Sequence, residues 1–356
     1  MSKKVIAIIF AIVAAILYAI NIPISKLLLN DINPTMMASY LYLGAGICVG
    51  LLYLLTKKKQ KEASEKYHKK DLPYVIGMIL LDILAPIFLM FGILDSASSN
   101  ASLLNNFEIV CTSLIALFIF KEVISKKMWI AISLITLSSF LLTFENIETF
   151  KMSWGSILVL LATLCWGLEN NCTRNLANKN TFSVVTIKGI FSGLGSLIVA
   201  LCLKESFPEF KYIILAMLLG FVAYGLSIFF YIKAQGVIGA SKTSAYYSLA
   251  PFVGTFLSFL ILKETLTISY FIGLIIMILG TIVVVLDTLE KKHVHEHSHT
   301  LIKEVNGVKQ TIVIKHSHEH LHYVNEESHT HKHLKKVRGY TFFVNNYFYY
   351  FIYLIR

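Results

Sequence analysis

The chain has 356 residues, of which 56% are hydrophobic and only 15% are charged, whereas soluble domains carry about 25% charged residues. This composition excludes a water-soluble enzyme, a disordered chain and a small secreted scaffold held by disulfides. The formal net charge is +11, but the lysines stand in short loops between apolar blocks, so we expect no nucleic-acid partner.

Ten apolar blocks are each long enough to cross the hydrocarbon core of a bilayer, about 30 Å thick, as a helix. We therefore predict an all-α integral membrane protein with ten transmembrane helices that contact the lipid bilayer. In chain order the predicted spans are residues 5–25, 34–55, 73–94, 100–120, 128–144, 154–172, 182–203, 212–232, 241–262 and 267–286.

Basic residues are distributed unevenly between the two sides of these spans. If the N-terminus is cytoplasmic, most lysines fall in cytoplasmic loops, including the run from Lys57 to Lys70, and few fall in the opposite loops. Because cytoplasmic loops are enriched in Lys and Arg, we predict a multi-pass protein of the cell (inner or plasma) membrane with both termini in the cytoplasm.

The two halves of the membrane region resemble each other. The tripeptide Phe-Lys-Glu at 120–122 ends the fourth span, and Leu-Lys-Glu at 262–264 ends the ninth. Each half has five spans, an odd number, so the second copy enters the membrane in the opposite sense. We predict inverted repeats at residues 1–146 and 147–290, an organisation typical of secondary transporters that bind substrate between the repeats.

Both halves also share a longer pattern: a small residue and Leu, a polar gap, a helix ending in Glu, and a new helix that starts with an aromatic residue, Ile and Gly. Residues 240–280 carry it best, with Pro251, Glu264, Gly273 and Gly280; residues 97–122 carry the first-half copy. In these motifs the chain resembles the drug/metabolite transporter superfamily, and within it the EamA-type family. The resemblance implies ten helices around a central cavity and alternating-access movement of small organic molecules, often amino acids or other metabolites.

Four ionisable residues fall away from the ends of the predicted spans, where a charge costs at least about 2.5–3.5 kcal/mol. Asp82 lies in the middle of the third span, Glu108 in the middle of the fourth, Glu169 late in the sixth and Lys188 early in the seventh. In one interpretation, Glu108 and Asp82 line a wet cavity as proton carriers or substrate ligands. In the other, one of them pairs with Lys188 or Arg174 and holds helices together.

Hydroxyl and amide side chains inside the spans are further candidates for the substrate site. They are Asn105 and Thr112 in the fourth span, Tyr224 and Tyr231 in the eighth, and Tyr247 and Ser248 in the ninth. Asn105 and Thr112 share a helix face with Glu108. Hydrogen bonds between helices are the alternative role for all of these groups.

Two glutamates, Glu122 and Glu264, end the repeated motif, and we expect them to cap the short turn that follows each. The chain has no Gly-rich loop followed by Lys and Ser or Thr, and no nucleophile–His–acid set falls within the spans. We expect no enzymatic activity and no required cofactor.

After the last span the composition changes to a His-rich tail, residues 291–338. Asn306-Gly307 between alternating runs predicts a β-hairpin with a type I′ turn. In that register His297 faces His316, His295 faces His318 and His293 faces His320, all on one strand face with opposed Cβ atoms about 5 Å apart. The predicted metal ligands are His293, His295, His297, His299, His316, His318, His320, His322, His329, His331 and His333.

Neutral imidazoles in such rungs suit Zn²⁺, Ni²⁺, Co²⁺ or Cu²⁺, so we predict a metal-binding tail. The alternative is a flexible tail whose metal affinity is incidental. The segment 339–356, dense in Tyr and Phe, is too short to span a membrane; it either lies at the interface or has no selected role.

The sequence favours a secondary transporter, and more specifically an exporter, of small organic metabolites such as amino acids, with a metal-responsive tail. Two alternatives stay open: a divalent transition-metal transporter and a membrane-embedded metal sensor that transports nothing. The absence of histidine from the predicted spans argues against a transition-metal path. Substrate identity, transport direction and oligomeric state are not encoded in any pattern we recognise.

Overall fold

A computed structural model describes residues 3–56, 66–121, 124–146, 151–176, 179–238, 243, 246–264, 266–305, 308–323, 333–337, 340–345 and 348–350. The chain divides into two compact units, Met1–Thr288 and Leu289–Arg356. Each unit is described by itself.

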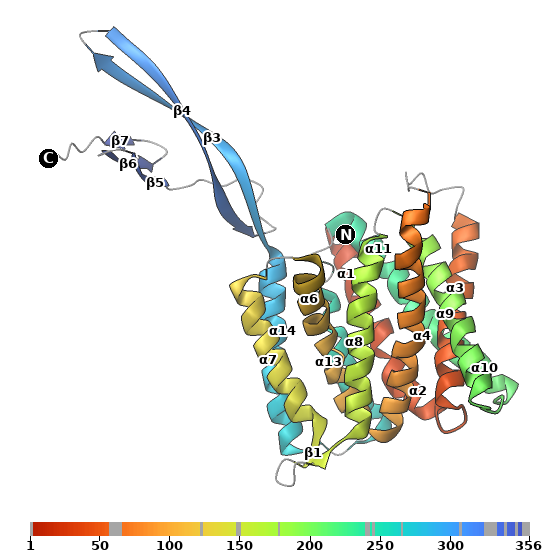
Figure 1. Cartoon of the computed structure of the whole chain (residues 1–356). Coiled ribbons are helices and arrows are strands. Elements are labelled where there is room, and N and C mark those ends of the chain that lie inside the picture. Colours follow the sequence, from red (N-terminus) through yellow and green to blue (C-terminus); the bar gives the residue numbers. More distant parts are fainter. Residues whose placement is uncertain are drawn as a thin grey trace. The chain divides into compact units, whose positions relative to one another are not determined.

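The first unit is built of helices, most of them roughly antiparallel to their neighbours (Figure 1). The helices of the first half are α1 (Lys3–Ala19), α2 (Asn21–Leu28), α3 (Pro34–Thr56), η2 (Lys69–Asp71), α4 (Leu72–Asp95), α5 (Ser98–Leu104), α6 (Phe107–Phe120) and α7 (Lys126–Thr143). The short strands β1 (Phe144–Asn146) and β2 (Lys151–Met152) pair between the halves. The second half consists of α8 (Trp154–Arg174), α9 (Thr181–Cys202), α10 (Phe210–Gly220), η3 (Phe221–Leu226), α11 (Ser227–Ile238), α13 (Ala250–Leu262) and α14 (Ile268–Leu289).

Several of the predicted spans are interrupted helices within the described residues. The first is divided at Ile20, because Pro23 has no amide hydrogen for the carbonyl of Ala19, where α1 ends. The fourth is divided into α5 and α6 by Asn105 and Asn106. The eighth continues from α10 to α11 through η3, a π-helical segment, and such segments are frequent at functional sites.

Within the described residues, eight helical stretches are long and apolar enough to cross a membrane. The sixth predicted span corresponds to α8, whose last turns carry Glu169, Asn170, Asn171 and Arg174 and which is not among the eight. The ninth is described as the shorter apolar helix α13. The prediction of a helical membrane protein is therefore confirmed at this level, whereas the count of ten spans stays a prediction.

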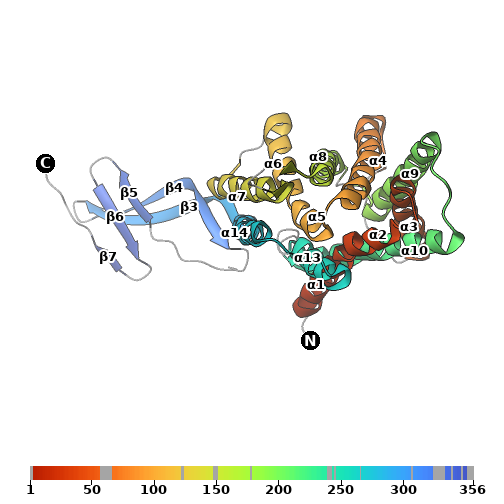
Figure 2. The ribbon, with the colours of Figure 1, turned by 90° about the horizontal axis from the view of Figure 1, so that it is seen from below.

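Close helix crossings hold the first unit together. In Figures 1 and 2, α3 lies against α9 and α10, and α4 lies against α8. A Cβ atom added to Gly46 of α3 would lie 2.5 Å from the Ile190 nitrogen of α9, and one added to Gly44 would lie 2.1 Å from the Met217 oxygen of α10. Small residues permit such approaches, which replace the hydrophobic effect as the source of helix association in lipid.

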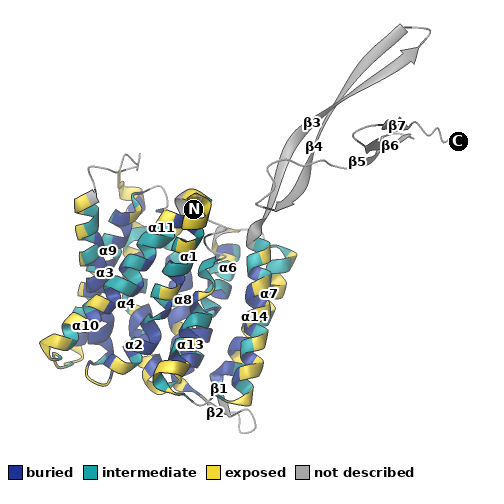
Figure 3. Ribbon diagram, turned by 180° about the vertical axis from the view of Figure 1, so that it is seen from behind, coloured by how far each residue is buried: buried dark blue, intermediate teal, exposed yellow. Residues whose placement is uncertain are grey.

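Large apolar side chains remain exposed on the outward faces of these helices (Figure 3). Examples are Phe118, which is 74% exposed, Ile198 at 62% and Phe256 at 59%. An exposed apolar surface this extensive is unfavourable in water but matches the hydrocarbon of a bilayer. The burial pattern therefore agrees with the helices contacting lipid.

The repeated Lys-Glu motif has the same backbone form in both halves. Lys121 ends α6 with φ 55° and Lys263 ends α13 with φ 52°, both in the left-handed region. Their amide groups donate to Ala116 and Phe259 respectively and so close the two helices. The shared C-cap fits an inverted repeat, although the division at 146/147 stays a prediction.

The second unit contains strands. β3 (Glu290–Val305) and β4 (Val308–Tyr323) pair antiparallel, with Val305 opposite Val308. His293 stands opposite His320, and His295 opposite His318, which is the register expected from the sequence. β5 (His333–Val337), β6 (Tyr340–Asn345) and β7 (Phe348–Tyr350) form a further antiparallel sheet in that order.

Several predictions about this tail lie outside the described residues. They are the turn at Asn306-Gly307 and the ligands His329 and His331. For the other tail histidines the structure describes the backbone pairing and not the side chains. Metal binding by the tail therefore stays a prediction.

Candidate functional site

A cavity of about 310 Å³ lies within the helical unit, and volumes of this order suit small organic ligands. Its polar lining residues are Asn105, Asn106, Glu108, Glu169, Asn170, Lys188 and Ser248. Its aromatic lining residues are Tyr18, Tyr42, Trp166, Tyr224 and Tyr247. These side chains come from both halves of the sequence, so the cavity depends on how the halves pack.

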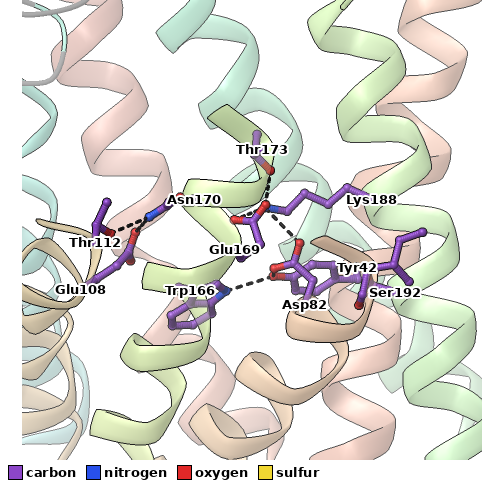
Figure 4. A network of polar contacts seen from close by, with 11 residues as sticks. Tyr42, Asp82, Glu108, Thr112, Trp166, Glu169, Asn170, Thr173, Lys188 and Ser192 are labelled. Carbon is purple, nitrogen blue, oxygen red and sulfur yellow. Dashed lines mark hydrogen bonds and ion pairs between the residues drawn. The ribbon is translucent and has the colours of Figure 1, made fainter. Parts of the chain in front are cut away.

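Beside the cavity, one lysine joins two buried carboxylates. The Nζ atom of Lys188 on α9 lies 3.0 Å from Oδ2 of Asp82 on α4 and 3.0 Å from Oε2 of Glu169 on α8 (Figure 4). Asp82 is fully buried and Glu169 is 2% exposed. Because an unpaired charge is costly in this environment, this triad holds α4, α8 and α9 together at mid-membrane.

Further hydrogen bonds fix the two carboxylates of the triad. The Tyr42 hydroxyl donates to Oδ1 of Asp82 at 2.9 Å, and Nε1 of Trp166 donates to the Tyr42 hydroxyl at 3.3 Å. The Thr173 hydroxyl donates to Glu169 (Figure 4). Each carboxylate therefore has a neutral hydrogen-bond donor in addition to Lys188, which fixes its orientation.

Glu108 has a different environment. It lies in the first turn of α6 and accepts a hydrogen bond of 2.6 Å from Nδ2 of Asn170 on α8 (Figure 4). The same Asn170 nitrogen lies 3.3 Å from the hydroxyl of Thr112. Among the described residues no lysine or arginine forms an ion pair with Glu108. It is therefore the carboxylate of this cluster that faces the cavity without a basic partner.

Aromatic rings form one wall of the cavity through mutual contacts. Ring centroids are 5.8 Å apart for Tyr18 and Tyr224, 5.8 Å for Tyr18 and Tyr247, and 5.5 Å for Tyr42 and Tyr224. Tyr231 packs edge-on against Tyr247 at 5.2 Å. The Tyr18–Tyr224 and Tyr231–Tyr247 pairs are edge-to-face and the other two are tilted. These contacts restrict the ring orientations, so the wall is largely formed before any ligand binds.

The interruptions in the helices bring polar groups to this wall. Asn21, just after the break between α1 and α2, donates through Nδ2 to the Tyr224 hydroxyl at 3.0 Å. Tyr224 itself lies in the π-helical segment η3. Ser25 donates to Oδ1 of Asn21 at 3.2 Å. The break between α1 and α2 therefore helps to position a cavity tyrosine.

Two amides beside Glu108 are buried with unused hydrogen-bonding atoms. Asn105 is 8% exposed and Asn106 is 2% exposed, and both line the cavity. In the described part of the chain, neither Oδ1 of Asn105 nor Nδ2 of Asn106 has a hydrogen-bond partner. Buried amide atoms normally are paired, so these two atoms can pair with a ligand once their side chains turn towards the cavity.

The structure thus brings most of the candidate residues to one place. Glu108, Asn105, Glu169, Lys188, Tyr224, Tyr247 and Ser248 line the cavity. Asp82 lies behind Lys188, Thr112 lies behind Asn170, and Tyr231 supports Tyr247. Their roles in substrate binding or coupling stay predictions, and the pairing role left open for Asp82 and Lys188 is the one their geometry displays.

Sequence reasoning did not select five of the polar and aromatic lining residues as site residues. These are Tyr18, Tyr42, Asn106, Trp166 and Asn170. Asn106 and Asn170 each directly follow a selected residue. The doubled Asn105-Asn106 in the first third of the predicted span is a signal that could have indicated the helix break.

Glu264, at the end of the repeated motif, caps a different helix from the one expected from the sequence. Oε1 of Glu264 accepts from the Ser98 amide at 2.7 Å and Oε2 from the Ser99 amide at 2.9 Å. Glu264 therefore caps the start of α5 in the other half of the sequence, and the expectation that it caps its own following turn was wrong. Glu122 lies outside the described residues.

Glu205 makes the same kind of contact at a second helix start. Its carboxylate accepts from the Thr35 amide at 3.2 Å and from the Met36 amide at 2.8 Å, at the beginning of α3. Lys26 donates to the carbonyls of Leu94 at 2.9 Å and Ser96 at 3.1 Å, where α4 ends. These groups satisfy helix ends that a bilayer interface leaves without partners.

No group of three or more His, Cys, Asp or Glu side chains arranged to hold a metal ion occurs in the described residues, as far as their side chains are described.

Antiparallel apolar helices around a cavity that contains buried ionisable groups define the class of membrane-embedded solute carriers. The EamA-like transporter family model matches the chain twice, over residues 5–144 and 153–286. The chain belongs to the EamA-like transporter family, within the drug/metabolite transporters, and is a multi-pass membrane transporter.

Individual relatives agree with this membership. An "Uncharacterized transporter" of Methanothermobacter thermautotrophicus is 27% identical over 290 residues, covering 76% of this chain and 84% of that protein. The "Uncharacterized transporter YyaM" of Bacillus subtilis is 24% identical over 269 residues, covering 73% and 87%. A solved crystal structure superimposes with a TM-score of 0.57 over 79% of this chain and 96% of its own, at 14% identity, which shows the shared fold alone.

Proposed function

We propose that this transporter is a secondary carrier that exports small organic metabolites, such as amino acids, by alternating access. The observation that carries the proposal is that the central carboxylates have different partners. Asp82 and Glu169 share Lys188, while Glu108 faces the cavity with Asn170 as its hydrogen-bond donor. An ionisable membrane residue without a counter-charge is a functional candidate by default.

In this proposal Glu108 binds either a proton or the substrate as the carrier alternates. The Asp82–Lys188–Glu169 triad keeps α4, α8 and α9 in a fixed arrangement around it. The aromatic wall of Tyr18, Tyr224 and Tyr247 accepts the apolar part of the substrate. A gradient of protons or of substrate drives one predicted repeat to rock against the other.

The test is Glu108→Gln, which keeps an acceptor oxygen for Asn170 but removes the charge. Purified variant and unmodified protein are reconstituted into vesicles, and efflux of preloaded metabolites is followed with and without a proton gradient. We expect gradient-driven flux to be abolished while the melting temperature in detergent is retained. Unchanged flux in Glu108→Gln defeats the assignment of Glu108.

Glu209→Gln is the matched control for this experiment. Glu209 is exposed and pairs with exposed Lys211 at 2.7 Å, outside the cavity. Its loss of charge should leave flux unchanged. If Glu209→Gln and Glu108→Gln lower flux equally, the loss is general and not specific to the cavity.

The membrane location and orientation belong to the same proposal. We place the protein in the cell (inner or plasma) membrane with both termini in the cytoplasm, because the basic loops lie on that side. Cysteine tagging of the loops after α2 and after α3, with an impermeant reagent, checks it. Labelling of the loop after α3 from outside intact cells contradicts it.

The tail is proposed to make transport metal-responsive through Zn²⁺, Ni²⁺, Co²⁺ or Cu²⁺. Its support is the register that sets His293, His295 and His297 opposite other histidines along β3 and β4. Flux of the full chain is measured with and without Zn²⁺, beside a variant whose tail histidines are asparagine. A Zn²⁺ effect that persists in the variant rejects the tail. Flux of the metal itself favours a divalent-metal carrier, and no flux of any solute favours a sensor.

A further inference from the structure

The charges around the cavity do not balance. Asp82, Glu108 and Glu169 are carboxylates, whereas Lys188 is the basic side chain among the described residues that line the cavity or pair with these groups. Lys188 already contacts one carboxylate oxygen on each side at 3.0 Å. With all groups ionised, the cavity therefore attracts a cation and repels an anion.

Uncharged hydrogen-bonding atoms adjoin the unbalanced carboxylate. Oδ1 of Asn105 and Nδ2 of Asn106 are buried at the junction of α5 and α6, three and two residues before Glu108, and have no partner in the described residues. An unmade hydrogen bond of a buried amide is unfavourable. A ligand that supplies a donor to Asn105 and an acceptor to Asn106 removes this cost.

We propose that the substrate is an organic ammonium ion whose second polar group is an uncharged acceptor. Its ammonium group binds between Glu108 and Oδ1 of Asn105, and its amide, ester or hydroxyl oxygen accepts from Nδ2 of Asn106. Its apolar group lies against the aromatic wall. This inference rests on the proposed function and names the substrate class of the same cavity.

The position of Lys188 distinguishes this class from free amino acids. A zwitterion brings a carboxylate that needs its own cation, and Lys188 is held by Asp82 and Glu169. Placing that carboxylate near Glu108 sets like charges together, which costs several kcal/mol when desolvated. Masking the carboxylate as an amide removes the repulsion and keeps the oxygen that Asn106 needs.

The aromatic wall provides a second reason for a cation. The faces of Tyr and Trp rings attract ammonium groups within about 6 Å. Tyr18, Tyr224 and Tyr247 line the cavity together with Trp166. An ammonium displaced slightly from Glu108 therefore still meets favourable electrostatics on the ring faces.

A matched ligand series tests the proposal by titration calorimetry on the purified full chain. The ligands are phenylalanine amide, phenylalanine, 3-phenylpropionate and phenethylamine, which share a benzyl group and differ in charge and acceptor. We expect phenylalanine amide to bind at least about tenfold more tightly than phenylalanine, and 3-phenylpropionate not to bind. Phenethylamine should bind more weakly than the amide because it lacks the acceptor.

Two variants test the acceptor-binding and ammonium-binding parts of the site separately. Asn106→Leu should weaken phenylalanine amide about tenfold and leave phenethylamine unchanged, since only the amide offers an oxygen to Asn106. Glu108→Gln should weaken both amines. Asn30→Ala, at an exposed position after α2, is the control and should change neither. If Asn106→Leu does not fold, Asn106→Ala removes the same donor.

The outcomes distinguish this inference from the proposed function. Tighter binding of phenylalanine or 3-phenylpropionate than of the amide overturns the cation class while leaving organic transport intact. An equal loss of both amines in Asn106→Leu overturns the role of Asn106. Failure of all four ligands to bind a preparation that transports other metabolites also overturns the class, whereas absence of all metabolite flux defeats the proposed function itself.

Discussion

Carboxylates occupy two regions of the helical unit, and they are stabilised in different ways. At the helix ends, Glu264 and Glu205 each accept hydrogen bonds from two backbone amides. Around the cavity, Asp82 and Glu169 share one lysine and Glu108 has one amide donor. The end carboxylates are satisfied by backbone that is fixed in place, while the central ones depend on side chains that a ligand or a proton can replace. A structural role fits the first region and the Asp82–Lys188–Glu169 triad, whereas the proposed transport role falls to Glu108.

The largest effect should come from removing the shared lysine. Lys188→Met leaves Asp82 and Glu169 buried beside each other without a cation, and breaking a buried ion pair on one side costs about 3–5 kcal/mol. We expect a strongly lowered melting temperature in detergent or loss of folded protein. Lys188→Arg keeps the charge and serves as the control. A fully stable Lys188→Met would mean that the triad does not hold these helices.

An intermediate effect is expected at the helix ends. Glu264→Ala removes the cap from the first two amides of α5, and losing an N-cap typically costs about 1 kcal/mol. The melting temperature should fall moderately, and binding of phenylalanine amide to the folded protein should be retained. If ligand affinity falls with stability unchanged, Glu264 belongs to the transport region after all.

The smallest effect should occur at the surface. Glu209→Gln breaks the ion pair with Lys211, in which both side chains are largely exposed, and exposed pairs contribute little because water screens them. We expect no measurable change in melting temperature at physiological salt. A markedly lower melting temperature of Glu209→Gln would show that charge alone, without burial, accounts for the effects in the other two regions.

Much of this molecule could be predicted from local sequence. The apolar blocks located nearly every helix, and the register expected around Asn306-Gly307 matched the pairing of β3 with β4. Glu108, Glu169 and Lys188 were selected because charge inside a membrane helix is rare. These inferences depend on spacing along one segment, which the sequence states directly.

Pairings between distant segments could not be predicted in this way. The sequence allowed Lys188 to pair with Asp82 or Glu108 and did not select Tyr42 or Asn106, whose positions depend on how α3 and α6 rotate against α8. Glu264 was assigned to its own turn, yet it caps α5, far away in the sequence.

The amino-acid sequence by itself determined that this is a helical membrane protein with charged residues in its spans, because helix length and hydropathy are properties of single segments. Only the tertiary structure decided which two carboxylates share Lys188 and which one faces the cavity without a basic partner among the described residues. Those choices depend on helix crossings set by glycine contacts such as Gly46 against Ile190, and a crossing is a property of two surfaces rather than of either segment.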